Sequence, residues 1–175
     1  MGRIAGINPL ARDIMSKRGI MPHMTDENSP ADVQVVIVED QPELAEIYKT
    51  RLELEGYTCA VASDGIQALV EIEKYRPRLV LLDLMLPKLS GDQILKVMRS
   101  TEWGEDIKVL VISNLNESEA PAGLRDLGIV DYMVKANLSD DQLDRVVGDI
   151  LKPIGQTEDI SLEGSDDSEI GSPAS

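Results

Sequence analysis

The residues most able to do chemistry are carboxylates that directly follow apolar runs. Asp83 comes after the aliphatic run 79–82, and Glu39 and Asp40 come after the segment 33–38, which is apolar except for Gln34. Continuous apolar runs of this length are typical of strands that are buried on both faces. Because an unpaired charge is costly in such surroundings, Asp83 either caps a neighbouring element or takes part in a reaction.

Three carboxylates that meet at one place repel one another unless a cation lies among them. A set of oxygen ligands with room for water and a phosphate fits Mg²⁺ better than Ca²⁺ or Zn²⁺. Ser113 follows the run 107–112 and Lys135 follows the run 130–134, so a hydroxyl and an ammonium group are available to bind phosphoryl oxygens. The sequence then predicts Asp83 as a nucleophile that takes a phosphoryl group as a mixed anhydride.

Each of these residues also has a plainer explanation when it is taken alone. Asp40 could cap the following helix, Ser113 could be an ordinary turn residue, and Lys135 could be a solvated strand end. Open α/β sheets bind their ligands beyond the carboxyl ends of the strands. The expected convergence of these side chains at that edge favours the chemical interpretation.

The strands and helices that must position these side chains alternate along the chain. The predicted strands cover residues 33–38, 57–62, 78–82, 107–112 and 130–134. Capping-box patterns open three of the helical segments, at Asp64-x-x-Gln67, Ser90-x-x-Gln93 and Ser139-x-x-Gln142. Because alternating strands and helices require right-handed crossovers, the sequence predicts an α/β fold, a doubly wound parallel sheet of five strands.

The sequence signals for a helix are clear in the first helical segment and weak in the fourth. The first starts with Pro42 in its first turn and ends before Gly56. Its predicted apolar face consists of Leu44, Ile47, Tyr48 and Leu52. The fourth, around residues 117–127, is the weakest, because Pro121 and Gly123 lie inside it.

Composition narrows the classes of function. The 175 residues carry a net charge of −15, which argues against direct binding to nucleic acid and favours protein partners. The one cysteine, Cys59, excludes an internal disulfide, fits a reducing cytoplasm and is expected to be a buried structural thiol. The one histidine, His23, excludes a histidine-based metal site. No apolar run is long enough to cross a bilayer and no secretory signal opens the chain, so no membrane partner is expected.

Three regions of the chain differ in composition. Residues 1–30 are predicted to be a disordered or weakly helical leader, and residues 31–152 to be the folded domain. Residues 153–175 contain six acids and no base, which predicts a disordered acidic tail.

Four motifs together resemble the receiver domains of two-component response regulators, also called CheY-like domains. The motifs are VVIVEDQPEL, LVLLDLMLPKLSG, VLVISN and DYMVKAN, in this order, within residues 33–151. The resemblance implies a flavodoxin-like (βα)5 fold with strand order 2-1-3-4-5 and a Mg²⁺ or Mn²⁺ cofactor. It also implies phosphorelay signal transduction, in which a sensor histidine kinase or a phosphotransfer protein supplies the phosphoryl group.

The resemblance also implies a metal-binding role for four of the residues. Asp83 is implied as the phosphoacceptor and as a metal ligand, Asp40 as a direct metal ligand, and Glu39 as a ligand through water. The Met85 backbone carbonyl is implied as a further metal ligand.

Further residues are implied in binding and releasing the phosphoryl group. The resemblance implies that Ser113 and Lys135 engage its oxygens, and that Tyr132 is the switch aromatic. The side chains of Met85 and Leu115 are implied to flank the approach of a hydrolytic water. Both are apolar, so we expect this gate to slow the loss of the phosphoryl group.

Three positions depart from the family pattern. Ala136 stands where the family commonly has a proline after the lysine, so the bond between Lys135 and Ala136 is predicted to be trans. Asn114 stands where a small residue is usual, and Pro121 with Gly123 interrupts the fourth helix. None of these changes removes a chemical group of the site, so phosphorylation remains the prediction.

The favoured function is a stand-alone receiver, which is not a turnover enzyme and catalyses only its own phosphorylation and dephosphorylation. Its output is expected through the face formed by the fourth helix, the fifth strand and the fifth helix, toward an unknown downstream protein. One alternative is a HAD-like phosphohydrolase, which typically carries a second aspartate where this chain has Met85. Another is a flavodoxin-like nucleotide binder, which would need a glycine-rich loop where this chain has EDQPE.

Overall fold

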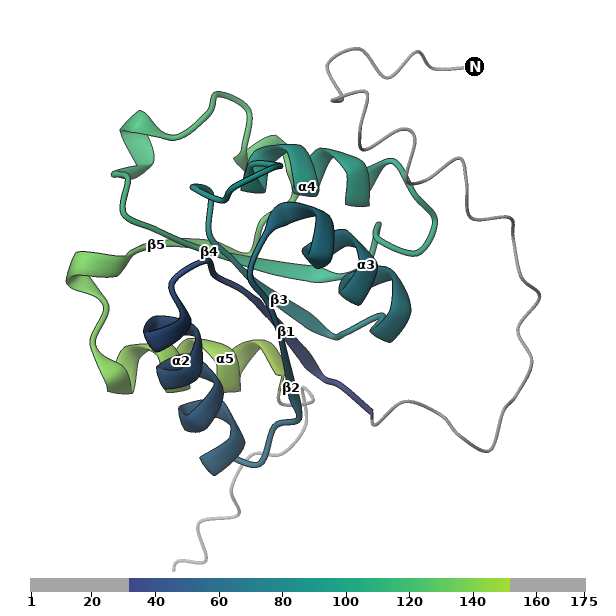
Figure 1. The fold of residues 1–175 in the computed structure, drawn as a ribbon. Helices are drawn as coiled ribbons and strands as arrows, with labels where there is room; N and C mark the ends of the chain where they lie inside the picture. Colours follow the sequence, from purple (N-terminus) through teal and green to yellow (C-terminus); the bar gives the residue numbers. More distant parts are fainter. Residues whose placement is uncertain (1–31, 152–175) are drawn as a thin grey trace, which may run out of the picture.

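The chain folds around one parallel sheet with helices on both faces (Figure 1). The computed structural model describes residues 32–151, so the predicted leader and acidic tail lie outside the described residues. The strands are β1 (Val35–Val38), β2 (Cys59–Ala62), β3 (Leu79–Leu82), β4 (Lys108–Ser113) and β5 (Asp131–Val134). They pair in parallel in the order β2-β1-β3-β4-β5, which confirms the predicted doubly wound architecture.

The helices begin where the sequence signals them. They are α2 (Pro42–Leu54), α3 (Gly65–Tyr75), α4 (Gly91–Arg99) and α5 (Asp140–Leu151). The Asp64 carboxylate caps α3 by accepting bonds from the Ile66 and Gln67 amides, both at 2.9 Å. At the start of α4, the Gln93 side chain accepts a bond from the Ser90 amide at 3.2 Å, as its capping pattern predicts.

Alternate residues of the buried strands face two separate apolar clusters. Val36, Val38, Val80 and Leu82 pack on the side of α3 and α4, whereas Val35, Ile37, Leu79 and Leu81 pack on the side of α2 and α5 (Figure 1). Burial on both faces explains why these strands are continuous apolar runs. On α2, Ala45, Tyr48 and Leu52 form the buried face. The prediction that Ile47 belongs to this face is wrong, since the residue is 51% exposed.

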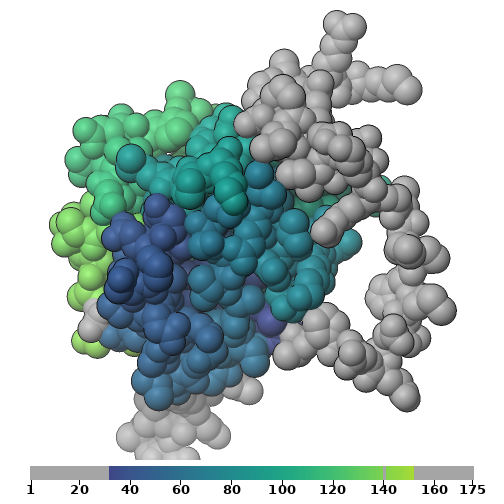
Figure 2. All heavy atoms as spheres, in the orientation of Figure 1, coloured from purple at the N-terminus to yellow at the C-terminus, as the bar shows by residue number. Residues whose placement is uncertain are grey.

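The connection between β4 and β5 contains no α-helix, and the structure describes all of its residues, 114–130. Two single 3₁₀ turns, η1 (Glu117–Glu119) and η2 (Arg125–Leu127), replace the helix predicted around 117–127. The physical reason is local: Pro121 has no amide hydrogen to donate, and Gly123 adopts a φ of +78°, outside the helical region. In the space-filling view, the green atoms of this connection lie on the outside of the molecule (Figure 2).

Arg99, the last residue of α4, ties this irregular connection to the rest of the fold. Its guanidinium group donates hydrogen bonds to the carbonyl oxygens of Leu127 at 2.7 Å, Ile107 at 3.0 Å and Gly128 at 3.1 Å. It also donates to the carbonyl oxygen of Gly104. One side chain therefore joins the end of α4, the approach to β4 and the approach to β5.

Cys59 is a partly buried free thiol in β2, and burial raises its pKa to about 12. Trp103 lies in the turn between α4 and β4, with the Arg76 guanidinium 5.7 Å from the centre of its ring. None of the helices within residues 32–151 is long and apolar enough to cross a membrane.

Candidate functional site

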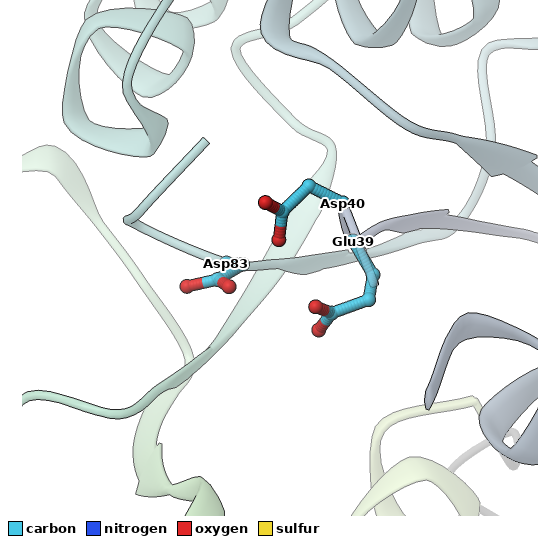
Figure 3. Close-up of side chains that lie close together, drawn as sticks. All are labelled: Glu39, Asp40 and Asp83. Carbon is cyan, nitrogen blue, oxygen red and sulfur yellow. The ribbon is translucent and has the colours of Figure 1, made fainter. Parts of the chain in front are cut away.

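The carboxyl edge of the sheet brings the predicted carboxylates together (Figure 3). One oxygen from each of Glu39, Asp40 and Asp83 lies within 4.8 Å of the others. The side chains of Glu39 and Asp83 are buried, whereas Asp40 is exposed. Glu39 and Asp40 directly follow β1, and Asp83 directly follows β3. They meet because these strands are neighbours in the sheet and end in register, with Val38 opposite Leu82.

Lys135 lies between the two buried carboxylates. Its Nζ is 2.6 Å from Asp83 Oδ2 and 2.7 Å from Glu39 Oε2, and the three side chains are at most 6% exposed. Burial by itself lowers the pKa of Lys135, but the hydrogen bonds to Asp83 and Glu39 raise it overall. Burial raises the pKa of Glu39, and Lys135 offsets this only in part. The structure thus brings Lys135 to Asp83, as predicted.

The turn after Asp83 holds its second oxygen. The Met85 amide donates a hydrogen bond to Asp83 Oδ1 at 3.0 Å, while the Met85 side chain is 56% exposed. The backbone of this turn passes very close to the start of α4. A Cβ on Gly91 would lie 2.3 Å from the Asp83 carbonyl oxygen and 2.8 Å from Leu84 Cα, so only glycine fits there.

Ser113 and Tyr132 are linked through the backbone of one residue. The Leu115 amide donates to Ser113 Oγ at 3.3 Å, and the Tyr132 hydroxyl donates to the Leu115 carbonyl oxygen at 2.9 Å. Ser113 is fully buried and Tyr132 is buried, so its ring points inward. The peptide bonds within residues 32–151 are all trans, which confirms the prediction for the bond between Lys135 and Ala136.

Tyr48 lies near the site, although its spacing on α2 predicts only a packing role. It lines a narrow hollow together with Glu39 and Asp83, on the α2 side of the sheet. The available signal was a phenol group on an otherwise aliphatic stripe of α2, eight residues after Asp40. Helical spacing alone predicts burial of that ring, not its closeness to the carboxylates of β1 and β3.

The arrangement has the charge and the donor atoms for a divalent cation. Three carboxylates against one ammonium group leave an excess of two negative charges at the cluster. The oxygen donors match the ligands that Mg²⁺ and Mn²⁺ prefer. The residues present therefore fit the ion that the sequence analysis expects, and they leave the exposed side of the cluster, at Asp40, open to solvent.

Comparison with known proteins gives the family. The model of the response regulator receiver domain matches residues 35–147. Response regulator MprA of Mycobacterium ulcerans is 38% identical over 104 residues, which cover 59% of this chain and 44% of that protein. The chain spans about half the length of the curated relatives that it matches, between 44% and 59%.

Solved structures agree with this result. The receiver domain of the Francisella response regulator 1452 is 29% identical, with a TM-score of 0.60 over 66% of this chain and 93% of that one. The receiver domain of sensor histidine kinase PA1611 from Pseudomonas aeruginosa, solved with a magnesium ion coordinated in its active-site cleft, is 25% identical. Its TM-score is also 0.60, over the same shares of the two chains. The chain therefore belongs to the response regulator receiver domains of two-component signalling.

Proposed function

We propose that this receiver takes a phosphoryl group onto Asp83 from a sensor histidine kinase or a phosphotransfer protein. The observation that carries the proposal is the state of the Asp83 carboxylate. It is 3% exposed, it touches Lys135 through one oxygen and the Met85 amide through the other, and two further carboxylates lie beside it. Burying so many charges together has a cost that folding alone does not require.

The transfer is a displacement at phosphorus. One carboxylate oxygen of Asp83 forms a bond to the phosphorus atom, and the bond from phosphorus to the donor nitrogen breaks. The other nitrogen of the donor ring carries a proton, so that an acyl phosphate and a neutral imidazole result. Lys135 is within hydrogen-bond distance of Asp83 Oδ2 and is therefore positioned to bind an oxygen of the transferred group. Ser113, buried at the end of β4, offers the second contact.

Glu39, Asp40, Asp83 and the Met85 carbonyl are the groups that would hold Mg²⁺ or Mn²⁺. When bound, the ion supplies positive charge that offsets the negative charge developing on the phosphoryl oxygens. The magnesium ion in the cleft of the PA1611 receiver supports this assignment.

The response starts at Ser113. A Ser113 hydroxyl that turns to a phosphoryl oxygen gives up the Leu115 amide, and Leu115 is also the partner of Tyr132. We infer that the output face for a downstream protein consists of residues 114–130, β5 and α5, with an irregular connection in place of the expected fourth helix. Direct binding to nucleic acid is not part of the proposal, given the net charge of −15.

The proposal includes activity without a separate effector domain and a cytoplasmic location. A turnover phosphohydrolase is disfavoured because Met85 stands where such enzymes carry an acid–base aspartate.

The test uses acetyl phosphate as donor and intact-protein mass spectrometry as readout. The parent protein should gain one phosphoryl group with Mg²⁺ present and none with EDTA. Asp83→Asn should gain none, whereas Asp64→Asn, a matched change after strand β2, should be labelled like the parent. Labelling of Asp83→Asn, or labelling of the parent in EDTA, contradicts the proposal.

A further inference from the structure

The amino edge of the sheet, where the strands begin, carries three exposed basic residues. Arg78 directly precedes β3 and Lys108 opens β4, and these strands are neighbours, with Leu79 opposite Lys108. Arg76 directly follows α3, and its guanidinium group lies 5.7 Å from the centre of the Trp103 ring. We call Arg76, Arg78 and Lys108 the amino-edge cations.

The carboxylates of the described fold do not neutralise the amino-edge cations. Within residues 32–151 none of the three forms an ion pair, whereas Lys49, Lys74 and Lys96 each pair with a carboxylate on their own helix. The amino-edge cations donate instead to backbone carbonyl oxygens, which accept only part of their hydrogens. In a chain with a net charge of −15, they form a local positive surface.

Two of the amino-edge cations bind the last turn of α5. Arg78 donates to the Leu151 carbonyl oxygen at 2.5 Å, and Lys108 donates to the Ile150 carbonyl oxygen at 3.3 Å. Leu151 is the last residue that the structure describes, so the segment after it starts at the positive surface. Glu158, the first of six acids in residues 158–169, is seven residues farther along, a span of at most about 25 Å. These acids are therefore within reach of the amino-edge cations.

We propose that the acidic residues 158–169 dock on the amino-edge cations of the same molecule. Six carboxylates meet three cations that still have hydrogens to donate. Single ion pairs on a surface contribute little, but a short connecting segment gives these groups a high effective concentration. The docked segment would compete with any other anionic partner for the amino edge. The contact is independent of the proposed phosphorylation, because Asp83 lies at the opposite edge of the sheet.

A spin label placed among the acids tests the contact in the full chain. Cys59→Ser with Ser165→Cys leaves one thiol for the label, which broadens the amide signals of nearby residues. The amides of Arg76, Arg78 and Lys108 should lose most of their intensity at low salt. They should recover it in 1 M salt, where the Debye length is about 3 Å. The amides of residues 114–130, at the other edge, should keep their intensity throughout.

Matched charge changes in the labelled protein assign the contact. Arg76→Gln with Arg78→Gln and Lys108→Gln should abolish the broadening, whereas Arg145→Gln, which removes an exposed cation of α5, should keep it. A second variant leaves the described fold untouched and replaces the six acids by their amides: Glu158→Gln, Asp159→Asn, Glu163→Gln, Asp166→Asn, Asp167→Asn and Glu169→Gln. It should also abolish the broadening.

Several results would overturn the inference. They are no broadening in the labelled protein, broadening centred on residues 114–130, broadening that persists in 1 M salt, and broadening that survives replacement of the six acids. A mixture of spin-labelled protein and isotope-labelled protein without the spin label gives a further check. Broadening of equal strength in that mixture would assign the contact to a second copy of the chain, against the proposal.

Discussion

The connection from β3 to β4 and the connection from β4 to β5 are stabilised in different ways. Between β3 and β4 the chain forms α4, in which Ile94, Leu95, Val97 and Met98 are fully buried. Between β4 and β5 it forms residues 114–130, where Leu124 is the one buried residue of a connection that the structure describes in full. The first connection is therefore held by its own apolar side chains. The second buries fewer apolar side chains and is also joined to the fold by hydrogen bonds near its two ends, from Tyr132 to Leu115 and from Arg99 to Leu127.

We expect the regular connection to hold Asp83 in place and the irregular connection to rearrange in the response. The regular connection carries the turn that holds Asp83, where a small displacement would disturb the carboxylate that we propose as the phosphoacceptor. The irregular connection follows Ser113, the last residue of β4, and its Leu115 amide donates a hydrogen bond to the Ser113 hydroxyl. Regions that rearrange come from the less stable parts of a fold, which suits this connection to signalling.

The largest expected effect involves both connections, because each supplies one of the two side chains, Met85 and Leu115, that are predicted to flank the approach of the hydrolytic water. Met85→Asn with Leu115→Glu should speed loss of the aspartyl phosphate by about 10²-fold, since polar side chains can orient the attacking water. The decay is followed by intact-protein mass spectrometry after removal of acetyl phosphate. Ile47→Asn, an exposed apolar residue on α2, is the control and should decay like the parent. A parent that decays as fast as the double variant refutes the gate.

A second experiment addresses why the two connections differ. Pro121→Ala with Gly123→Ala removes a helix penalty of about 4 kcal/mol in total. Residues 117–127 should gain helix, measured by Cα chemical shifts and by circular dichroism. Ala122→Ser, a change at a position between them, should leave the connection irregular. If the double variant also stays irregular, the contacts at the ends determine its shape, and not these two residues.

Arg99→Met tests whether one side chain holds the irregular connection. It keeps the aliphatic stem but loses hydrogen bonds from a charged group to four carbonyl oxygens. The free energy of unfolding should fall by roughly 1.5–3 kcal/mol, and amide exchange should accelerate at Leu127 and Gly128 before it does in α4. Lys96→Met, which removes an exposed pair with Asp92 on the same helix, should change stability by less than about 0.5 kcal/mol. Uniform acceleration across the domain would contradict a local role.

The smallest expected effects compare one glycine from each connection. Gly91→Ala forces a Cβ against the backbone of Asp83 and Leu84, so stability should fall by about 1–3 kcal/mol and phosphorylation should slow. Gly123→Ala meets only open space and the end of the Asp126 side chain, so its cost is the left-handed strain of about 1 kcal/mol. Urea unfolding measures both. Normal phosphorylation of Gly91→Ala would show that the close packing there does not position Asp83.

The sequence predicts the parts of the molecule that depend on local pattern. The five strands, the caps at Asp64 and Gln93 and the convergence of Glu39, Asp40 and Asp83 all follow from apolar runs, cap residues and the parallel order of strands. The helix expected at 117–127 does not form, and Pro121 with Gly123 is the local reason.

Other features depend on contacts between residues far apart in the chain. The bond from Arg99 to Leu127 spans 28 residues, and the nearness of Tyr48 to Asp83 arises only once α2 packs on the sheet. Ile47 lies next to Tyr48 in sequence, but successive helical residues point about 100° apart, and the way α2 packs on the sheet buries Tyr48 and leaves Ile47 exposed. The spacing of residues along the sequence does not predict these contacts.

Trp103 gives the protein a built-in optical probe. It is the one tryptophan of the chain, and it lies before β4, at the opposite edge of the sheet from Asp83. Unfolding separates its indole from the Arg76 guanidinium and moves it into water, so its emission should shift to longer wavelength. Because the site is at the other edge, the same fluorophore should stay silent when metal or a phosphoryl mimic binds. A single emission spectrum can therefore report the stability of each variant independently of its chemistry.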